Sequence, residues 1–459
     1  MNRIRHIYIL LGLTAAGAFV SCSGVKSLSA PQIDVPEHII AGADDSLTLA
    51  DVEWWSVYGD ASLQKIIRTT LAHNRTLQAA AATIEEMQQL YHVGRAGLFP
   101  ALSAEVAADY ETNDYYHGKS SRDAEYDLKA SISWEADLFG RLRWAKKQGY
   151  AKWMGAVEDY RAVKMTLIAE AATAYFNLVA LDNELDIVQR TLRNRSESVE
   201  KAKLRFEGGL TSELVYQQAC VEYASTASLV PSLQQRISTT ENQLKLLMGE
   251  FPGESVGRIG SMVEIPDSAR FSIGLPSQLI NRRPDIRSAN QKLMAASAQV
   301  GVDYADRFPR LTISLVGGAE NDDLTALLKS PFSYIGGNLI APLFDFGKKK
   351  ARYKASVAAY DRARLQYENT VIQAFTDVAD AVTVFRNARK TLQLKTNSRD
   401  AARKYVELAE LQYRAGSISY IDVLDAQRRY FDAQIGHSNA IRDENLALVN
   451  LYKALGGGW

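Results

Sequence analysis

The sequence of 459 residues has little of what metal-binding and disulfide-bonded proteins need. It contains two cysteines, Cys22 and Cys220, so it cannot form a framework of several disulfide bonds. The six histidines are scattered, and no two of them stand at the spacing of metal ligands. Methionine is sparse as well, so nothing in the composition favours a site for a soft metal. We therefore expect no metal and no cofactor.

Basic excess and catalytic motifs are also missing. The 53 lysines and arginines equal the 53 aspartates and glutamates, so no excess of positive charge points to nucleic acid. There is no glycine-rich phosphate loop, and no serine or cysteine nucleophile stands in a recognisable motif. The glycine run 456–458 is more typical of a frayed chain end than of a ligand site. The sequence therefore predicts a protein that is not an enzyme.

Long apolar runs are absent too. The apolar run from Ile7 to Val20 has about 14 residues, too few to cross a bilayer core of about 30 Å. It follows Arg3 and Arg5, as in a secretory signal peptide. The next residues, Ser21 and Cys22, complete a Phe-Val-Ser-Cys sequence that resembles a bacterial lipobox, in which the cysteine is lipidated and begins the mature chain. An ordinary signal peptide with an incidental cysteine is the alternative.

What is present is an internal repeat, in which the two halves of the sequence share their pattern of key residues. Pairs of glycine, proline and aromatic residues recur at offsets of 207 to 209 residues: Pro100 and Pro309, Phe139-Gly140 and Phe346-Gly347, Gly209 and Gly416, Ala219 and Ala426, Gly249 and Gly456. Most other side chains differ between the halves. The repeat therefore predicts a duplicated architecture rather than a duplicated catalytic site.

Each half contains a very long segment that is typical of a helix. Lys348 to Ala415 has no glycine or proline, and a single helix of about 68 residues would be roughly 100 Å long. The corresponding run, Ala156 to Glu207, is shorter because Gly149 and Gly155 precede it. Apolar residues recur at heptad-like steps, interrupted at Arg195: Leu178, Leu181, Leu185, Val188, Leu192, Val199, Ala202 and Phe206, then Val371, Phe375, Val378, Val382, Phe385 and Leu392. Their charged neighbours exclude burial in lipid.

Four segments alternate between apolar and polar residues. The alternation is regular from Tyr126 to Leu138, and it predicts strands at about 101–112, 125–138, 310–319 and 332–345. About ten alternating residues can span a membrane in a barrel, although a soluble sheet with one solvated face fits the pattern equally well. Four strands cannot close a barrel, so a barrel would be shared between chains. Two copies would give eight strands and three would give twelve.

These patterns predict a mainly helical chain with a membrane β-barrel and a repeated order of helix, two strands, long helix and shorter helix. We expect a signal peptide at 1–21, a lipidated extended segment at 22–60, a first repeat at 61–250, a linker at 251–275 and a second repeat at 276–459.

Several motifs resemble those of TolC/OprM-type outer-membrane efflux lipoproteins. They are Trp54-Trp55, Leu98-Phe99-Pro100, the run from Trp134 to Arg141, Arg282-Arg283-Pro284-Asp285-Ile286, Phe308-Pro309, the run from Ala341 to Gly347, and Tyr413-Arg414-Ala415-Gly416 followed by the run from Tyr420 to Ala426. The resemblance implies a homotrimer with a twelve-stranded barrel in outer-membrane lipid and a helical tunnel in the periplasm. It also implies an exit duct for drugs, detergents or other toxic compounds that docks onto a periplasmic adaptor and an inner-membrane pump.

The resemblance also assigns roles to individual residues. Asp422, Asp425 and Tyr413 correspond to a periplasmic gate, and Gly209 and Gly416 mark the turns that dock the adaptor. Threefold symmetry would crowd six carboxylates, attract cations and raise some of their pKa values. For Asp422 the alternative is a capping box with Ser419. Ile418 stands where the best-known relative has a basic residue, which leaves open how the gate is held shut.

A different class of protein explains part of the pattern. A lipid-anchored coiled-coil scaffold or adhesin, without transport, would use the long helices but would leave the alternation from Tyr126 to Leu138 unexplained. A substrate-specific porin is disfavoured, because more than half of the chain would then be helix without a role.

Overall fold

The computed structural model describes residues 55, 58–113, 118, 121–259 and 276–457. The chain divides into two compact units. The first contains Thr83–Val157 and Ser288–Glu368, and the second contains Glu158–Arg287, Asn369–Trp459 and the described residues up to Ala82. Each unit therefore takes segments from both halves of the sequence. Among the described helices, none has an apolar stretch long enough to cross a lipid bilayer.

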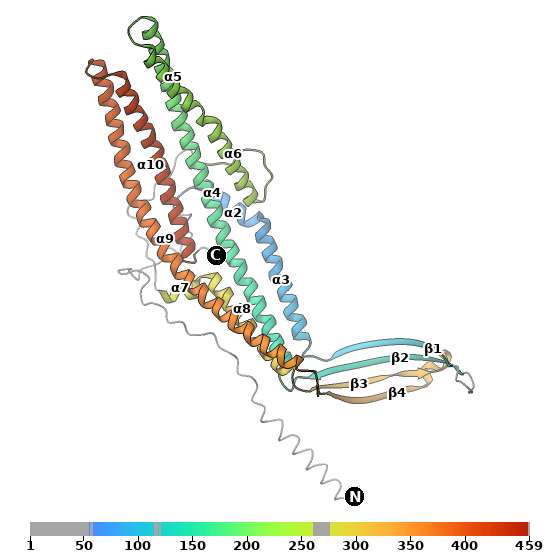
Figure 1. Ribbon diagram of the computed structural model, residues 1–459. Coiled ribbons are helices and arrows are strands. Elements are labelled where there is room, and N and C mark those ends of the chain that lie inside the picture. The colour runs from blue at the N-terminus through green and yellow to red at the C-terminus, as the bar shows by residue number, and fades with distance from the viewer. Residues whose placement is uncertain (1–54, 56–57, 114–117, 119–120, 260–275, 458–459) are drawn as a thin grey trace. The chain divides into compact units, whose positions relative to one another are not determined.

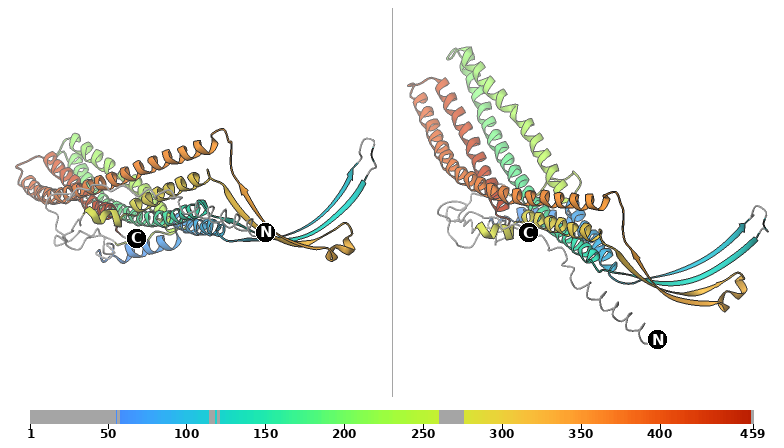
Figure 2. Two further views of the ribbon diagram at one scale, coloured as in Figure 1. Left: turned by 90° about the horizontal axis from the view of Figure 1, so that it is seen from below. Right: turned by 60° about the horizontal axis from the view of Figure 1, so that its bottom comes forward.

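A four-stranded antiparallel sheet lies in the first unit, with its strands in sequence order (Figure 1). The strands are β1, Ala101–Asn113; β2, Ser121–Ala136; β3, Arg310–Asn321; and β4, Pro331–Ile340. A short 3₁₀ helix, η3, Leu324–Lys329, connects β3 to β4. The strands curve along their length (Figure 2). The outer strands β1 and β4 each keep one edge that no other described strand covers.

Two strands end earlier than the alternation predicts. β2 stops at Ala136 because the Asp137 carboxylate accepts hydrogen bonds from the backbone N–H groups of Leu142 (3.1 Å) and Arg143 (2.9 Å), and so caps the next helix. β4 stops at Ile340 rather than at residue 345. Its alternation is interrupted by Pro342, which has no N–H group to give to a strand ladder.

The two hairpins of the sheet have the same register. Ala101 of β1 pairs with Ser133 of β2. Arg310 of β3, 209 residues after Ala101, pairs with Ile340 of β4, 207 residues after Ser133. The same two offsets relate the Phe-Pro and the Phe-Gly steps of the sequence. The hairpins therefore correspond residue by residue.

The sheet has one apolar and one polar face, as the alternation predicts. Residues opposite each other on antiparallel strands share a face. Ile132 of β2 lies opposite Leu102 of β1 and Leu315 of β3. On the other face the hydroxyl oxygens of Ser103 and Ser131 are 2.8 Å apart. Large apolar side chains on the first face are exposed in the single chain. A surface of this kind is suited to contact with lipid.

Four helices adjoin the sheet in the first unit: α3, Arg75–Ala96; α4, Arg141–Glu207; α8, Pro284–Ala305; and α9, Lys348–Arg414. α4 and α9 both have 67 residues. The run without glycine and proline in the first half begins at Ala156, but α4 itself begins at Arg141 and continues through Gly149 and Gly155. A Cβ at Gly149 would lie 3.4 Å from the Cα of Tyr91 on α3, and one at Gly155 would lie 3.6 Å from the Cβ of Gln291 on α8. These glycines allow close helix packing instead of ending α4.

The second unit is helical. It contains α2, Ala61–His73; α5, Glu213–Ala227; α6, Leu229–Met248; α7, Pro276–Arg282; and α10, Tyr420–Ala454, together with parts of the helices above. α4 turns back into α5, and α9 turns back into α10 (Figure 1). The chain breaks at Ser228 between α5 and α6, because Pro231 has no N–H group to bond to the carbonyl of Ala227. α10 has no proline and is continuous.

Parts of the heptad-like stripes of α4 and α9 are buried in the core of the second unit. Its buried residues include Leu178, Val179, Val378, Val382, Phe385, Leu448 and Leu451. Arg195 interrupts the stripe but is only 8% exposed. Its guanidinium lies 3.0 Å from a Glu222 carboxylate oxygen and donates to the Thr226 hydroxyl. Burial lowers the pKa of Arg195, while the charge of Glu222 opposes that shift.

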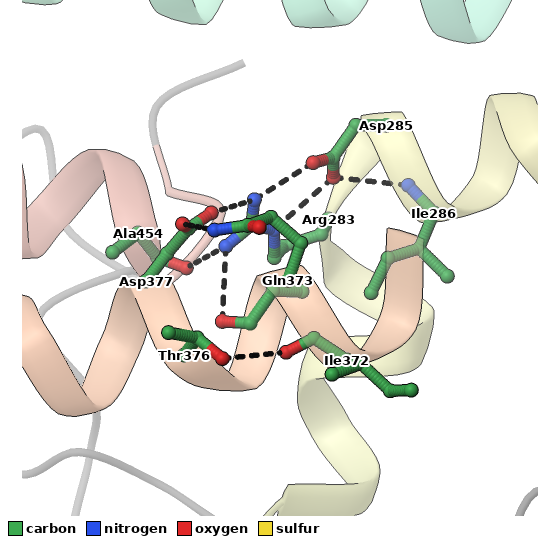
Figure 3. A network of polar contacts seen from close by, with 9 residues as sticks. Arg283, Asp285, Ile286, Ile372, Gln373, Thr376, Asp377 and Ala454 are labelled. Carbon is green, nitrogen blue, oxygen red and sulfur yellow. Dashed lines mark hydrogen bonds and ion pairs between the residues drawn. The ribbon is translucent and has the colours of Figure 1, made fainter. Parts of the chain in front are cut away.

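Arg283, from the Arg-Arg-Pro-Asp motif, connects three helices of the second unit (Figure 3). Its guanidinium bonds to the carboxylates of Asp285 at 2.7 Å and Asp377 at 2.9 Å. It also donates to the backbone carbonyls of Ala374 on α9 and Ala454 at the end of α10. Only 6% of Arg283 is exposed. The last carbonyls of a helix have no partner within it, so Arg283 caps α10.

The expectation of a frayed glycine tail is wrong for its first two residues. Gly456 and Gly457 are buried. Gly456 has a φ of 75°, and a Cβ at this position would lie 2.9 Å from Cγ of Arg283. The Gly457 N–H bonds to the Tyr452 carbonyl at 3.3 Å. These glycines therefore end α10 in a tight turn against Arg283.

Candidate functional site at the hairpin tips

The hairpin tips are the turn at 208–212, between α4 and α5, and the turn at 415–419, between α9 and α10. Gly209 and Gly416 have left-handed φ values of 70° and 73°. In each tip the glycine N–H bonds three residues back, and the next N–H bonds five residues back, to the carbonyls of Arg205 and Gln412 respectively. This arrangement is a Schellman motif. It favours glycine because a Cβ is disfavoured in the left-handed conformation of this residue.

Apolar side chains are exposed around both tips. They include Leu210, Leu214, Leu411 and Ile421. Exposed leucines at the end of a helical hairpin have no packing role within the described chain. The tips therefore present an apolar surface on which another protein could pack.

Asp422 forms the capping arrangement that the sequence offers as an alternative to a gate. Its carboxylate accepts hydrogen bonds from the Ser419 N–H at 2.9 Å and from the Ser419 hydroxyl at 2.7 Å. Both residues lie at the first turn of α10, where a negative charge is stabilised by the helix dipole. In this chain Asp422 is therefore directed at its own helix end.

Asp425 is paired with two arginines of the same helix. One carboxylate oxygen lies 2.7 Å from Nη2 of Arg428, and the other lies 2.7 Å from Nε of Arg429. The hydrogen bond from Arg429, together with the charges of both arginines, lowers the pKa of Asp425. Within the chain, the Asp425 carboxylate is therefore ion-paired. Its pKa is lowered, whereas crowding of acids would raise it.

Tyr413 bonds across the hairpin tips. The Arg205 guanidinium, near the end of α4, donates to the Tyr413 hydroxyl on α9 at 2.6 Å. The Tyr413 ring lies 5.3 Å from the ring of Tyr420. Arg205 thus connects the first hairpin to the second, within 4 residues of the Gly209 turn.

A small apolar cluster supports the second tip. Ala409, Val423 and Ala426 are buried, and Tyr413 and Ile418 pack against them. Ile418 thus fills an apolar position in the tip. Near the tips, a polar connection between the hairpins is made by Arg205 and Tyr413.

The structure brings these candidates together only in part. Asp422, Asp425 and Tyr413 lie at one tip, and Gly209 lies at the other. Sequence reasoning missed Arg205, Arg428 and Arg429. The spacing of Arg428 and Arg429, three and four residues after Asp425, was a usable signal for ion pairing on a helix. The pairing of Arg205 with Tyr413 joins residues 208 apart and had no local signal. Cys22 lies outside the described residues.

A second group of acids lies on the polar face of the sheet. The carboxylates of Glu125, Asp127 and Glu320 have oxygens within 4.8 Å of one another. Asp127 is buried and forms an ion pair with Lys129. Asp127 lies directly opposite Glu320 in the strand register. The alternation placed Asp127 on the polar face, and the strand register shows that Glu320 lies opposite it.

The sequence of this chain matches known proteins over most of its length. The model of the family described as "Outer membrane efflux protein" matches residues 66–250 and 275–457. The toluene efflux pump outer membrane protein TtgI of Pseudomonas putida is 32% identical over 413 residues, which cover 88% of this chain and 86% of the relative. The pyoverdine export outer membrane protein OpmQ of the same species is 29% identical, covering 91% of this chain and 90% of the relative.

Solved structures agree with the fold. The outer-membrane channel OprN is 28% identical with a TM-score of 0.85, covering 95% of this chain and 98% of that one. The open state of the MtrE outer membrane channel of Neisseria gonorrhoeae is 25% identical with a TM-score of 0.81, again covering 95% and 98%. The likeness extends over nearly the whole chain in both cases.

Proposed function

The chain belongs to the outer membrane efflux protein family, and we propose that it is the passive, gated exit duct of a tripartite efflux system. Members of this family are outer-membrane transport channels and not enzymes. The duct has no energy source of its own, so a periplasmic adaptor and an inner-membrane pump deliver the exported molecules. The substrates are small toxic compounds, in line with relatives named for toluene efflux and pyoverdine export.

The observation that carries this proposal is the sheet with two different faces and two uncovered edges. Its apolar side chains are exposed, as lipid contact requires. A sheet edge cannot remain unpaired in lipid, and four strands cannot close a barrel. Three copies would form a barrel of twelve strands, with the polar faces lining a lumen. The long helices would form a periplasmic tunnel below it.

The repeat organisation follows the same plan. We propose repeats at 61–250 and 276–459, joined by a linker at 251–275, after a signal peptide at 1–21 and a lipidated segment at 22–60. The two ranges matched by the family model, 66–250 and 275–457, support this division. Lipid on Cys22 would add an anchor to a chain already held by its barrel.

The hairpin tips would form the gate and the docking surface. Asp422, Asp425 and Tyr413 would lie at the periplasmic constriction, and the turns at Gly209 and Gly416 would meet the adaptor. Because Asp425 is paired with arginines of its own helix, its ion pairs would set the charge of the constriction, and the Arg205–Tyr413 bond between the hairpins would help to hold the gate. The exposed leucines of the tips support adaptor docking.

The decisive experiment measures assembly and conduction on the purified full-length protein. Native mass spectrometry in detergent should give a trimer, and planar-bilayer recordings should give discrete single-channel currents. A lipid-anchored scaffold or adhesin would give no currents under the same conditions. A strain that lacks the gene, challenged with a panel of drugs, solvents and bile salts, would then identify the exported compounds through the loss of resistance.

A further inference from the structure

Two phenylalanines at the end of the sheet stack on each other. Phe139 follows β2 and Phe308 precedes β3, so the pair lies where the two hairpins of the chain meet. Their ring centroids are 4.7 Å apart and the rings are nearly parallel, at 16°. Both side chains are half-buried. Stacked aromatic rings of this kind add stability beyond the apolar area they cover.

The repeat supplies a counterpart for each ring. Phe346 stands 207 residues after Phe139 and follows β4, and Phe99 stands 209 residues before Phe308 and precedes β1. In the single chain, Phe346 is 92% exposed and Phe99 is 57% exposed. These two rings therefore flank the two outer strands, whose free edges need a partner.

We propose that Phe346 of one copy stacks on Phe99 of the next copy, and that β4 pairs with β1 of that copy in the register of β2 and β3. This inference rests on the proposed trimer and names its contact residues. Ile132 of β2 lies opposite Leu315 of β3. With the hairpin offsets applied, Leu339 of β4 lies opposite Val106 of the neighbouring β1.

The apolar face supports this register. Leu339 shares the face of Leu311, and Val106 shares the face of Leu128, as their pairing within the chain shows. Both are exposed apolar side chains in the single chain. A slip of one residue would place Leu339 against the polar face of β1 and reverse every side chain. The register of β2 and β3, applied to β4 and the neighbouring β1, therefore places apolar side chains opposite apolar side chains.

The backbone of Phe346 is a second, independent indication. Its φ of 51° makes it the non-glycine residue with a positive φ among the described residues. A large side chain in this region is strained, and such strain persists where surrounding contacts hold the residue. Within the chain the ring touches Phe344, with centroids 4.5 Å apart, and otherwise faces outward. A neighbouring Phe99 would supply the missing contact.

Disulfide cross-linking tests the register directly. Opposed residues of antiparallel strands have Cα atoms about 4.5 to 5.5 Å apart, within the range of roughly 4.4 to 6.8 Å that a disulfide bridges. In full-length protein carrying Cys220→Ser, the pair Val106→Cys and Leu339→Cys should form covalent trimers on non-reducing gels. The control pair Ile132→Cys and Leu315→Cys should link within one chain. A pair shifted by one residue, Val106→Cys and Ile340→Cys, should not link.

A double-mutant cycle tests the ring contact. Phe99→Ala and Phe346→Ala are measured alone and together by the rate at which trimers dissociate in warm detergent. The two changes should couple by roughly 2- to 12-fold in rate, the range of measured aromatic pairs. Phe99→Ala combined with Phe139→Ala should show independent effects, because these rings belong to different pairs.

The outcomes separate this contact from the proposed function. A monomer by native mass spectrometry overturns the assembly and the contact together. A conducting trimer without the Val106–Leu339 cross-link, but with the control link formed, overturns the register alone. A conducting trimer in which Phe99→Ala and Phe346→Ala act independently overturns the stacking alone.

Discussion

At the scale of single residues, the bond between Arg205 and Tyr413 connects two helices that belong to different hairpins. Both residues are at least partly exposed, so the bond competes with water and its net contribution is near the low end for a hydrogen bond to a charge. In the proposed gate, such a bond would be strong enough to bias the equilibrium between an open and a closed state. It is too weak to hold the fold.

Tyr413→Phe should therefore raise the open probability of the channel without unfolding it. Loss of about 1 kcal/mol from the closed state corresponds to an increase of roughly fivefold in opening. Single-channel recording measures this directly. Tyr420→Phe is the matched control, since it removes a hydroxyl from the neighbouring ring and leaves the Arg205 bond intact. Equal effects of the two changes would mean that the bond does not hold the gate.

The ion pairs of Asp425 make the charge of the tip depend on pH. Because its pKa is lowered in the folded state, pairing with Arg428 and Arg429 is fully present above the ordinary pKa of aspartate. It is lost as the pH falls through the lowered pKa, when the carboxylate becomes neutral. The tip should thus gain positive charge only in acid.

Asp425→Asn should reproduce that acid state at neutral pH. The arginines would lose their partner, so the reversal potential in a salt gradient should shift toward anion preference. Arg428→Ala with Arg429→Ala should shift it toward cations. Asp443→Asn, which removes an acid paired with Arg442 elsewhere on α10, should leave the reversal potential unchanged. A reversal potential that Asp425→Asn leaves unchanged would place the constriction away from this residue.

At the scale of elements, the face on which a strand residue lies determines which substitutions are tolerated at that position. Ile132→Arg should impair assembly at a cost of about 2 to 4 kcal/mol if the residue lies near the bilayer midplane, because Ile132 would face lipid in the proposed barrel. Ser133→Arg, one residue along on the polar face, should assemble and alter conductance. Heat-modifiable mobility on gels measures assembly. The reverse pattern would refute the register, and equal tolerance at both positions would favour a soluble sheet.

Arg283 shows how one element boundary can hold several helices. Removing one side of a buried ion pair costs about 3 to 5 kcal/mol, because the remaining charges are left without a partner. Arg283→Ala should therefore lower the unfolding temperature clearly. Arg442→Ala, which breaks a surface pair with Asp443, should change stability by about 0 to 1 kcal/mol. Thermal unfolding followed by circular dichroism would compare the two variants.

The sequence predicted elements well where the period was long and uninterrupted. The four strands and α9 followed from alternation and from the absence of glycine and proline. The start of α4 at Arg141 did not follow from the glycine-free run, because Gly149 and Gly155 lie within the helix and pack closely against other helices. Asp422 and Asp425 were proposed as gate residues from the resemblance alone. The spacing of Arg428 and Arg429 after Asp425 was a usable signal for their pairing on α10, whereas Arg205 and Tyr413 are 208 residues apart and no local pattern indicated their contact.

At the scale of the whole molecule, the acids of the sheet raise the question of where ions are selected. Paired residues on the polar face place Asp109 opposite Glu125, Glu111 opposite Asp123, and Asp127 opposite Glu320. Like charges directly opposite each other destabilise a sheet. There are three such pairs on one face, with Lys129 as a nearby cation, and in the proposed barrel this face would line the lumen, where the acids would attract cations at some cost in stability.

Neutralising these pairs should therefore separate stability from selectivity. Asp109→Asn with Glu320→Gln should raise the temperature at which trimers dissociate in detergent, since two opposed pairs are relieved by roughly 0.2 to 1 kcal/mol each. The same variant should lower cation preference in a salt gradient, because three copies remove six charges from a narrow lumen in which screening is weak. Glu135→Gln is the control, since Glu135 is already paired with Arg141 at 2.8 Å; its loss should lower stability instead. If the double variant dissociates sooner and its selectivity is unchanged, the acids stabilise the sheet and ion selection occurs at the hairpin tips.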